Sequence, residues 1–360
     1  SPAAEQLLLD CLQLRHDFDM VMVTERRAQE IVATMGKCSF RYIAVIHGTE
    51  LLDYFGGKRF DLAIQPQRMA QFYEGAEFCI AVSHATSQLA KVLLKNDRVR
   101  LVTIQNGVNL ARLAPPRLAD SGRLRQRYGT GAEIVFCLGR LDLDKGQDVL
   151  IKAFRKVRNQ RPRARLLIGG KGPYSTSLDK LRSALGLDDC VELLGEISSV
   201  DLPAYFEVCD IFALTSRSEN RWEGFGLVYL EAGYYGKAVL GGNEGGVQEA
   251  ICDKVSGIIV ASRDEEAIAA AIVTLLGDKA LCARMGKQGR QRVLSYFNSS
   301  RMASETLGHV VLALHNKPPS SSRYERALLA WSLLGKGVRT VASKALQAIR
   351  SRCLRTSIGQ

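Results

Sequence analysis

Short apolar runs that alternate with stretches of helical periodicity constrain the fold of this chain more than any other feature. In the first third of the chain, four such runs lie at 19–23, 42–46, 78–82 and 101–104. The stretches between them that repeat apolar residues at helical spacing are 26–35, 66–75 and 87–94. Parallel strands buried on both faces are continuous apolar runs, and helices usually connect them. The pattern therefore predicts a parallel sheet covered by helices.

The same alternation restarts after a predicted linker, Ala114-Pro115-Pro116 followed by Ala119-Asp120-Ser121-Gly122. Further apolar runs predict six strands, at 134–138, 165–168, 191–194, 211–214, 238–240 and 257–260. Helices are predicted at 147–158, 177–185, 200–209, 226–235, 247–252, 265–276 and 279–296, and Ser199 is the expected N-cap of the third. Six strands separated by helices complete one doubly wound domain.

The length of 360 residues favours two domains rather than one. We predict an α/β architecture with two Rossmann-like, doubly wound domains, an incomplete one over 1–116 and a complete one over 117–300. A helix at 301–316 and a tail at 317–360 would follow. Ligands of such sheets bind beyond the carboxyl ends of the strands, so a cleft between the two domains is the expected binding site.

Composition excludes several other classes of protein. Apolar residues make up 46% and charged residues 24% of the chain, which is an ordinary globular balance. The sequence contains no run of 18 apolar residues, so it predicts no membrane-spanning helix. None of the nine cysteines forms a C-x-x-C pair, which argues against a zinc site or a redox pair. Free buried thiols in the reducing cytosol are the expected state.

The net charge of +12 belongs mostly to the end of the chain. Residues 317–360 hold nine Lys or Arg and one Glu, which leaves only +4 for the preceding 316 residues. The body of the protein therefore gives no signal for nucleic-acid binding. Beyond a second predicted linker at 318–322, residues 323–355 have the pattern of a basic amphipathic helix that lies on an anionic membrane. A solvated tail and a helix packed on the body are the alternatives.

The segment from Glu223 to Glu231 carries the strongest chemical signal. Gly224, Phe225, Gly226 and Leu227 follow Glu223 directly, and Glu231 lies inside the helix predicted from Gly226 onward. The glycines let the backbone approach a ligand and open a helix whose free N–H groups favour phosphate. One carboxylate could then bind sugar hydroxyls and the other a ribose, on either side of a pyrophosphate. Gly245-Gly246 and Val247-Gln248-Glu249, further on, make this pattern more specific.

Two cations follow the first strand of the second half. Gly139 and Arg140 come directly after the run ending at Leu138, and Lys145 precedes the helix predicted from Gln147. A nucleoside diphosphate gains negative charge as it leaves a sugar, so fixed cations stabilise the transition state more than the ground state. Arginine adds a bidentate fork. The alternative is a pair of solvated surface cations.

A D-x-D pattern also occurs twice, at Asp142-Leu143-Asp144 and at Asp17-Phe18-Asp19. Such a pair can hold a divalent metal at a donor diphosphate. Arg140 and Lys145 already supply positive charge there, so we predict a site that needs no metal.

These motifs resemble the family-4 retaining glycosyltransferases of the GT-B fold, over about Asp19 to Leu314. The resemblance extends to Ile46-His47-Gly48-Thr49, to Val82-Ser83 and to Asn106-Gly107-Val108-Asn109. It implies that Glu223 and His47 face the donor sugar, that Glu231 contacts the ribose, and that Arg140 and Lys145 bind the diphosphate.

By the same resemblance, the helix at 301–316 crosses back to the first domain, and the leaving phosphate accepts the acceptor's proton in a same-face attack. Without the resemblance, His47 would be a structural histidine at a strand end. The implied donor is a UDP- or GDP-sugar and no cofactor is needed. Segment 222–231 is similar to mannosyltransferases that use GDP-mannose. A saccharide or lipid-linked acceptor of the cell envelope is expected, in the cytoplasm at the inner face of the membrane.

One departure from that family matters. Its members begin with a strand and a Gly-rich loop, whereas residues before Asp17 supply neither and Ser1–Arg15 is predicted to be one helix. The first two or three strands are therefore expected to be missing, and the chain to bind a nucleotide while turning over slowly. A nucleotide-sugar 2-epimerase of the same architecture and a non-catalytic nucleotide-sugar-binding subunit remain the alternatives.

Overall fold

The computed structural model describes residues 19–36, 38, 40–56, 64–113, 118–219 and 221–316. The predicted N-terminal helix, Asp17 and Phe18, the Ala114-Pro115-Pro116 linker and the tail over 317–360 lie outside the described residues. The described chain divides into two units. The first contains 19–82, 87–105 and 299–316, and the second contains 83–86 and 106–298.

The first unit is a four-stranded parallel sheet in the order β1-β2-β3-β4. Its strands are β1 (Val21–Val23), β2 (Tyr42–Ile46), β3 (Cys79–Ala81) and β4 (Leu101–Thr103). The helices are α2 (Arg26–Thr34), α3 (Thr49–Phe55), α4 (Pro66–Gly75), α14 (Ser299–Asn316) and α5 (His84–Leu94), of which the part from Ser87 onward belongs to this unit.

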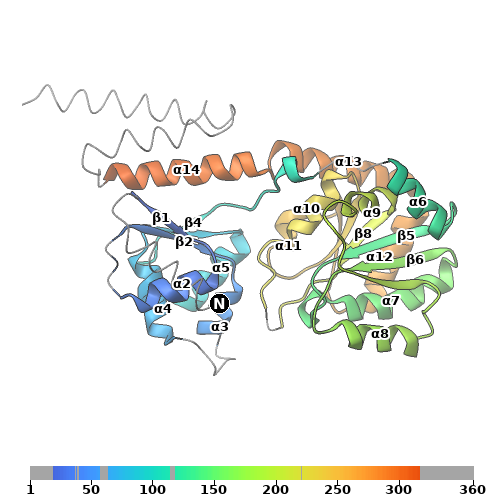
Figure 1. The fold of residues 1–360 in the computed structure, drawn as a ribbon, viewed down its shortest axis with the longest axis horizontal. Coiled ribbons are helices and arrows are strands. Elements are labelled where there is room, and N and C mark those ends of the chain that lie inside the picture. Colours follow the sequence, from blue (N-terminus) through green and yellow to red (C-terminus); the bar gives the residue numbers. More distant parts are fainter. Residues whose placement is uncertain are drawn as a thin grey trace, which may run out of the picture. The chain divides into compact units, whose positions relative to one another are not determined.

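Both faces of this sheet are covered, and β2 shows why its sequence is apolar throughout. Alternate residues of the strand, Tyr42, Ala44 and Ile46, belong to the core that includes α2, α3 and α4. Ile43 and Val45 point to the other core, where they pack with residues of α14. Figure 1 shows α14 lying along the sheet of this unit. A strand buried on both sides cannot alternate apolar with polar residues.

The second unit has a six-stranded parallel sheet in the order β10-β9-β8-β5-β6-β7. Its strands are β5 (Glu133–Leu138), β6 (Ala164–Gly169), β7 (Val191–Gly195), β8 (Ile211–Leu214), β9 (Ala238–Gly242) and β10 (Gly257–Val260). Its helices are α6 (Leu118–Tyr128), α7 (Gln147–Gln160), α8 (Ser175–Ala184), α9 (Leu202–Val208), α10 (Leu227–Tyr234), α11 (Val247–Ala250), α12 (Glu265–Gly277) and α13 (Lys279–Ser295), with the 3₁₀ turns η1 (Leu110–Arg112) and η2 (Leu143–Lys145).

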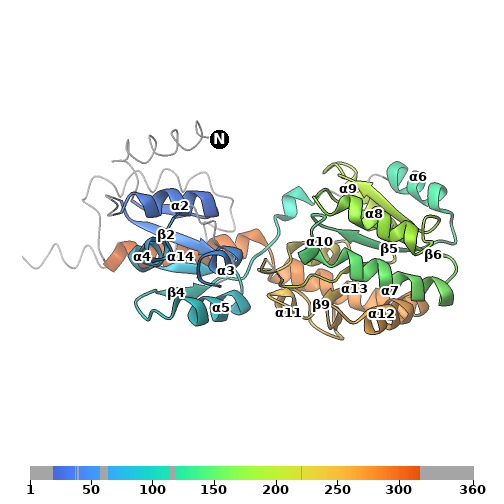
Figure 2. The ribbon, with the colours of Figure 1, turned by 90° about the horizontal axis from the view of Figure 1, so that it is seen from below.

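Helices cover both faces of this second sheet (Figures 1 and 2). On one face α7 packs against α8 and α12, and on the other α10 packs against α13 while α6 packs against α9. The strand order reverses direction between β5 and β8, which come from different halves of the unit. This is the switch point beyond which doubly wound sheets bind their ligands.

The two halves of the predicted α/β fold are thus both present as parallel sheets, and their strands have the predicted number. Local predictions were wrong in two places. Ala119–Gly122 belongs to α6 rather than to a linker, because Leu124 and Tyr128, one turn apart, pack on the core and carry the segment into a helix. Ser199 is not the N-cap of α9. The Ser198 hydroxyl instead closes a turn with Asp201, and the helix begins after Asp201 with Pro203 in its first turn.

Helix α3 was not predicted, since seven residues are too few to show a helical period. Among the described residues, none of the helices combines the length and the apolar composition needed to cross a bilayer.

Candidate active site

Three loops meet at the carboxyl edge of the second sheet, because all of its strands are parallel. They follow β5, β8 and β9, at 139–146, 215–226 and 243–246. The Thr215 hydroxyl donates to the Gly146 carbonyl over 3.0 Å, and the Arg217 N–H donates to the Asp144 carbonyl over 2.8 Å. The Gly246 N–H donates to the Glu223 carbonyl over 2.8 Å. These bonds join the two predicted motifs into one structure.

Glycines allow these backbones to approach so closely. Gly146 has φ +68°, and a Cβ there would lie 2.1 Å from the Thr215 carbonyl oxygen. A Cβ on Gly245 would lie 2.2 Å from the Glu223 oxygen, and one on Gly246 would lie 2.3 Å from the Gly224 oxygen. No side chain fits at such distances, so the glycines fix where the loop bearing Glu223 sits.

Lys145 and Glu223 form the central contact of the site. The Lys145 Nζ lies 2.6 Å from the Glu223 Oε2, and the two side chains are 27% and 11% exposed. Both residues were predicted to act on the donor, and the structure brings them together from different loops. Because the pair is partly exposed, an incoming diphosphate would meet Lys145 beside the carboxylate that is predicted to bind the sugar.

Arg140 lies on the same loop as Lys145, directly after Gly139. Its guanidinium NH2 is 2.7 Å from the Asp142 Oδ2, and its side chain is 45% exposed. The Arg140 carbonyl accepts a 3.0 Å hydrogen bond from the Gln147 side-chain amide. The loop backbone is therefore fixed while the guanidinium faces solvent, which is the arrangement needed to bind an anion from solution.

Helix α10 begins where the Glu223 loop ends. Its N-cap is Gly226, in the left-handed region at φ +87°, and Leu227 is the first helical residue. Phe225 is buried against Phe297, so it anchors the loop rather than facing solvent, whereas Leu227 is 41% exposed. The first N–H groups of a helix have no partner within it, so this end can receive an anion.

Glu231 lies one turn into α10, about 6 Å along the axis from Leu227. Its carboxylate has no hydrogen-bond or ion-pair partner within the described part of the chain. Burial raises its pKa from 4.5 to about 7. An acid half-buried without a partner destabilises the protein when charged, and its retention is typical of a ligand-binding group.

A glutamine at position 231 should remove part of the pH dependence of stability. Because the folded pKa exceeds the unfolded value, the folded state binds more protons between pH 4.5 and 7. This carboxyl therefore lowers the free energy of unfolding as pH rises through that window, by at most about 1.4 kcal/mol per pH unit, and adds nothing further above it. We expect urea unfolding of Glu231→Gln between pH 5 and 8 to show a shallower decline. Glu207→Gln, an exposed site on α9, is the control, and identical slopes in wild type and Glu231→Gln would contradict the expectation.

Sequence reasoning missed a buried ion pair that supports the site. The Arg217 NH1 lies 3.1 Å from the Asp148 Oδ1, and the side chains are 5% and 11% exposed. The pair joins the loop after β8 to the first turn of α7. The side-chain oxygens of Gln147 and Ser218, in the same region, are buried without a partner among the described residues. A charged residue shortly after a strand is the signal that could have identified this pair. That signal identified Arg140, whereas Arg217 was not predicted.

His47 follows β2 in the first unit. Its backbone N–H donates over 2.6 Å to the Glu50 Oε1, and its residue is exposed. Glu50 is buried and also accepts from the Gly48 N–H, so one carboxylate holds the loop that carries the imidazole. The role of His47 toward the donor sugar stays a prediction.

The D-x-D segment is engaged by arginines. Asp142 pairs with Arg140, and the Arg221 Nε lies 3.7 Å from Asp142 and 4.0 Å from Asp144. Within the described ranges, no three His, Cys, Asp or Glu side chains are grouped so that they could hold a metal ion. Independence from metal stays a prediction.

Comparison with solved structures defines the class of fold. Sucrose-phosphate synthase from Thermosynechococcus elongatus aligns with a TM-score of 0.73 and 23% identity, over 88% of this chain and 78% of that chain. Anabaena Alr3699/HepE in complex with UDP-glucose aligns with a TM-score of 0.70 and 23% identity, over 86% and 84%. The chain has the GT-B fold, as predicted.

Sequence comparison matches the second unit to a known family. Residues 123–292 match the family Glycosyl transferases group 1. A GDP-mannose-dependent alpha-(1-6)-phosphatidylinositol monomannoside mannosyltransferase of Mycolicibacterium smegmatis is 39% identical over 192 residues, 52% of this chain and 50% of that protein. The lipopolysaccharide core biosynthesis mannosyltransferase LpcC of Rhizobium leguminosarum is 31% identical over 206 residues, 56% of each chain.

The match to the group 1 glycosyl transferases lies within the second unit of the chain and agrees with the predicted family. The chain spans about half the length of the curated relatives that it matches.

Proposed function

We propose that this protein transfers a sugar with retention of configuration from a nucleotide-sugar donor to a saccharide or lipid-linked acceptor. The observation that carries the proposal is the Lys145–Glu223 contact of 2.6 Å, made between the loops after β5 and β8. Glu223 lies in the loop that leads into α10, so a cation, a carboxylate and a helix N-terminus are close together. A diphosphate attached to a polyhydroxylated group would contact all three.

Each group has a role in the proposed reaction. Arg140, Lys145 and the first N–H groups of α10, with Gly224, Gly226 and Leu227, hold the diphosphate and stabilise the charge that develops as the bond to the sugar breaks. Glu231, one turn along the helix, accepts hydrogen bonds from the ribose. Glu223 binds the sugar hydroxyls. The acceptor hydroxyl attacks from the face that the diphosphate leaves, and its proton passes to the departing phosphate oxygen.

We further propose GDP-mannose as the donor and a lipid-linked saccharide of the cell envelope as the acceptor. The support is that relatives matching this unit include GDP-mannose-dependent enzymes that act on phosphatidylinositol mannosides and a lipopolysaccharide core mannosyltransferase. Activity on such a lipid would place the protein at the inner face of the membrane.

A thermal-shift panel of GDP-mannose, UDP-glucose and ADP-glucose tests the donor. A ligand that binds only the native state at about 100 times its Kd stabilises it by about 2.7 kcal/mol, so GDP-mannose should raise the melting temperature most. Arg140→Gln/Lys145→Gln should abolish that shift. Lys180→Gln, at an exposed site on α8 that has no ion-pair partner among the described residues, should keep it. An equal shift in wild type and the double variant would refute the proposed site.

Sugar transfer is measured with the same three donors in the presence of EDTA, with a lipid-linked mannoside as the acceptor. Transfer that persists in EDTA agrees with the proposal, and transfer that stops and returns with manganese contradicts metal independence. Release of an epimerised free sugar without an acceptor would favour the 2-epimerase instead.

A further inference from the structure

A cavity of about 750 Å³ opens in the second unit at the opposite end of its sheet from the candidate active site. Its walls include the first residue of β5 and the residues just before β8 and β9, so it lies at the amino edge of the strands. We call it the amino-edge pocket. Five basic side chains line it, namely Arg125, Arg161, Arg163, Lys237 and Lys279.

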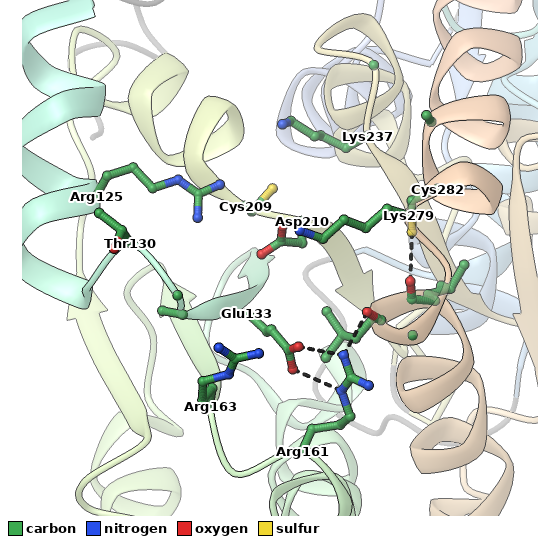
Figure 3. Close-up of a pocket in the computed structure, with 17 residues that line it drawn as sticks. Arg125, Thr130, Glu133, Arg161, Arg163, Cys209, Asp210, Lys237, Lys279 and Cys282 are labelled. Atoms are coloured by element: carbon green, nitrogen blue, oxygen red, sulfur yellow. Dashed lines mark hydrogen bonds and ion pairs between the residues drawn. The ribbon is translucent and has the colours of Figure 1, made fainter.

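The two carboxylates in the pocket are already engaged. Glu133 faces Arg161, whose Nε lies 2.9 Å from the Glu133 Oε2 (Figure 3). Asp210 accepts a 2.7 Å hydrogen bond from the Ile134 N–H. Five cations against two carboxylates leave an excess of positive charge in the pocket.

Two of the five cations have structural work. Arg161 also donates to the Leu276 carbonyl over 2.9 Å, which satisfies the end of α12. Lys237 donates over 2.9 Å to the Glu207 carbonyl near the end of α9. Basic side chains commonly satisfy the carbonyls at helix C-termini. These two residues therefore need no ligand to explain them.

The other three cations, Arg125, Arg163 and Lys279, have no such explanation. Their side chains make no hydrogen bond or ion pair with any residue that the structure describes. They come from α6, from the loop between α7 and β6, and from the start of α13, and Figure 3 shows all three reaching toward the middle of the pocket. Lys279 is the first residue of a 17-residue helix, whose N-terminus adds further positive potential.

Two thiols in the wall do not give the pocket a nucleophile. Burial raises the pKa of Cys209 to about 12 and that of Cys282 to about 11, so both stay protonated at neutral pH. The chemistry of the pocket is that of anion binding rather than of catalysis.

We propose that the amino-edge pocket binds a phosphate-bearing ligand through Arg125, Arg163 and Lys279. The cavity is within the range of small-molecule sites, and two arginine forks with one ammonium suit a multiply charged phosphate group. The ligand is not the sugar donor, since the groups proposed for the donor lie at the carboxyl ends of the same strands. The phosphate can belong to a soluble metabolite or to a lipid headgroup.

The test uses the whole chain with inorganic pyrophosphate as the probe in isothermal titration. Arg125→Gln/Arg163→Gln/Lys279→Gln should weaken binding by about tenfold or more, because three charge-assisted contacts are lost. Arg155→Gln/Lys180→Gln/Lys287→Gln removes three exposed cations outside the pocket that make no ion pair within the described ranges, and this variant should bind as wild type does. Binding should also persist in Arg140→Gln/Lys145→Gln, which separates this site from the proposed donor site.

A second arm sediments the same variants with vesicles of phosphatidylglycerol or of phosphatidylcholine. Loss of pyrophosphate binding in the pocket variant supports a soluble phosphate ligand. If the pocket variant, and none of the other variants, loses binding to phosphatidylglycerol vesicles, the ligand is a lipid headgroup. The proposal would be overturned if the control triple variant lost as much binding as the pocket variant. It would also be overturned if the pocket variant bound both pyrophosphate and phosphatidylglycerol vesicles as wild type does.

Discussion

Replacing Glu223 with alanine is expected to abolish sugar transfer while leaving the fold and donor binding in place. The Glu223 carboxylate contacts Lys145 at 2.6 Å, and its proposed partner in catalysis is the transferring sugar. Removing one group that is aimed at the transition state typically lowers kcat by about 10²–10³. The diphosphate would still meet Arg140 and Lys145, so the fall should appear in kcat more than in donor affinity.

The backbone explains why the fold should survive. The loop is held at position 223 by its carbonyl, which accepts from the Gly246 N–H, and alanine keeps that carbonyl. A partly exposed ion pair contributes at most about 1 kcal/mol to stability. The measurements are transfer rate, donor-induced thermal shift and urea unfolding, with Glu207→Ala on α9 as the matched control. Turnover at the wild-type rate in Glu223→Ala would remove Glu223 from the mechanism.

The strands of this protein were predictable because a strand buried on both faces is a short apolar run in the sequence. The predicted bounds of β2, β8 and β10 agree with the structure, and each is a short apolar run between polar segments. The sequence signal for helix α6 is weaker. Gly122 and Ser121 suggest a loop, and only the packing of Leu124 and Tyr128 on the core overrides that preference.

The site was predictable only in part, for a related reason. Arg140 and Lys145 lie in the loop after a strand, and Glu223 lies in a glycine-containing segment just before a helix, so each motif could be placed at the same edge of the sheet. The contact between Lys145 and Glu223, 78 residues apart, depends on the order of β5 and β8 in the sheet.

The same holds for the Arg217–Asp148 pair, whose members are 69 residues apart. Glu231 was placed correctly on its helix. Its raised pKa and its lack of a partner among the residues that the structure describes follow from packing that no local pattern contains.

Gly146→Ala is expected to disrupt the candidate active site by displacing the backbone, although Gly146 itself has no proposed contact with the donor. Alanine at φ +68° is strained by about 1–2 kcal/mol. In addition its Cβ would meet the Thr215 carbonyl oxygen at 2.1 Å, and a backbone atom cannot turn aside as a flexible side chain would. The loop after β5 must therefore move, and Lys145 moves with it.

Gly186→Ala separates the two effects. Gly186 has nearly the same φ, +66°, but open space where its Cβ would lie. Both variants carry the strain, and only Gly146→Ala carries the clash, so urea unfolding should show Gly146→Ala to be less stable by about 2 kcal/mol more than Gly186→Ala. The donor-induced thermal shift should disappear in Gly146→Ala and remain in Gly186→Ala. If the two variants lose equal stability and both keep the shift, the approach of the two loops does not hold Lys145 in place, and the geometry proposed for diphosphate binding is wrong.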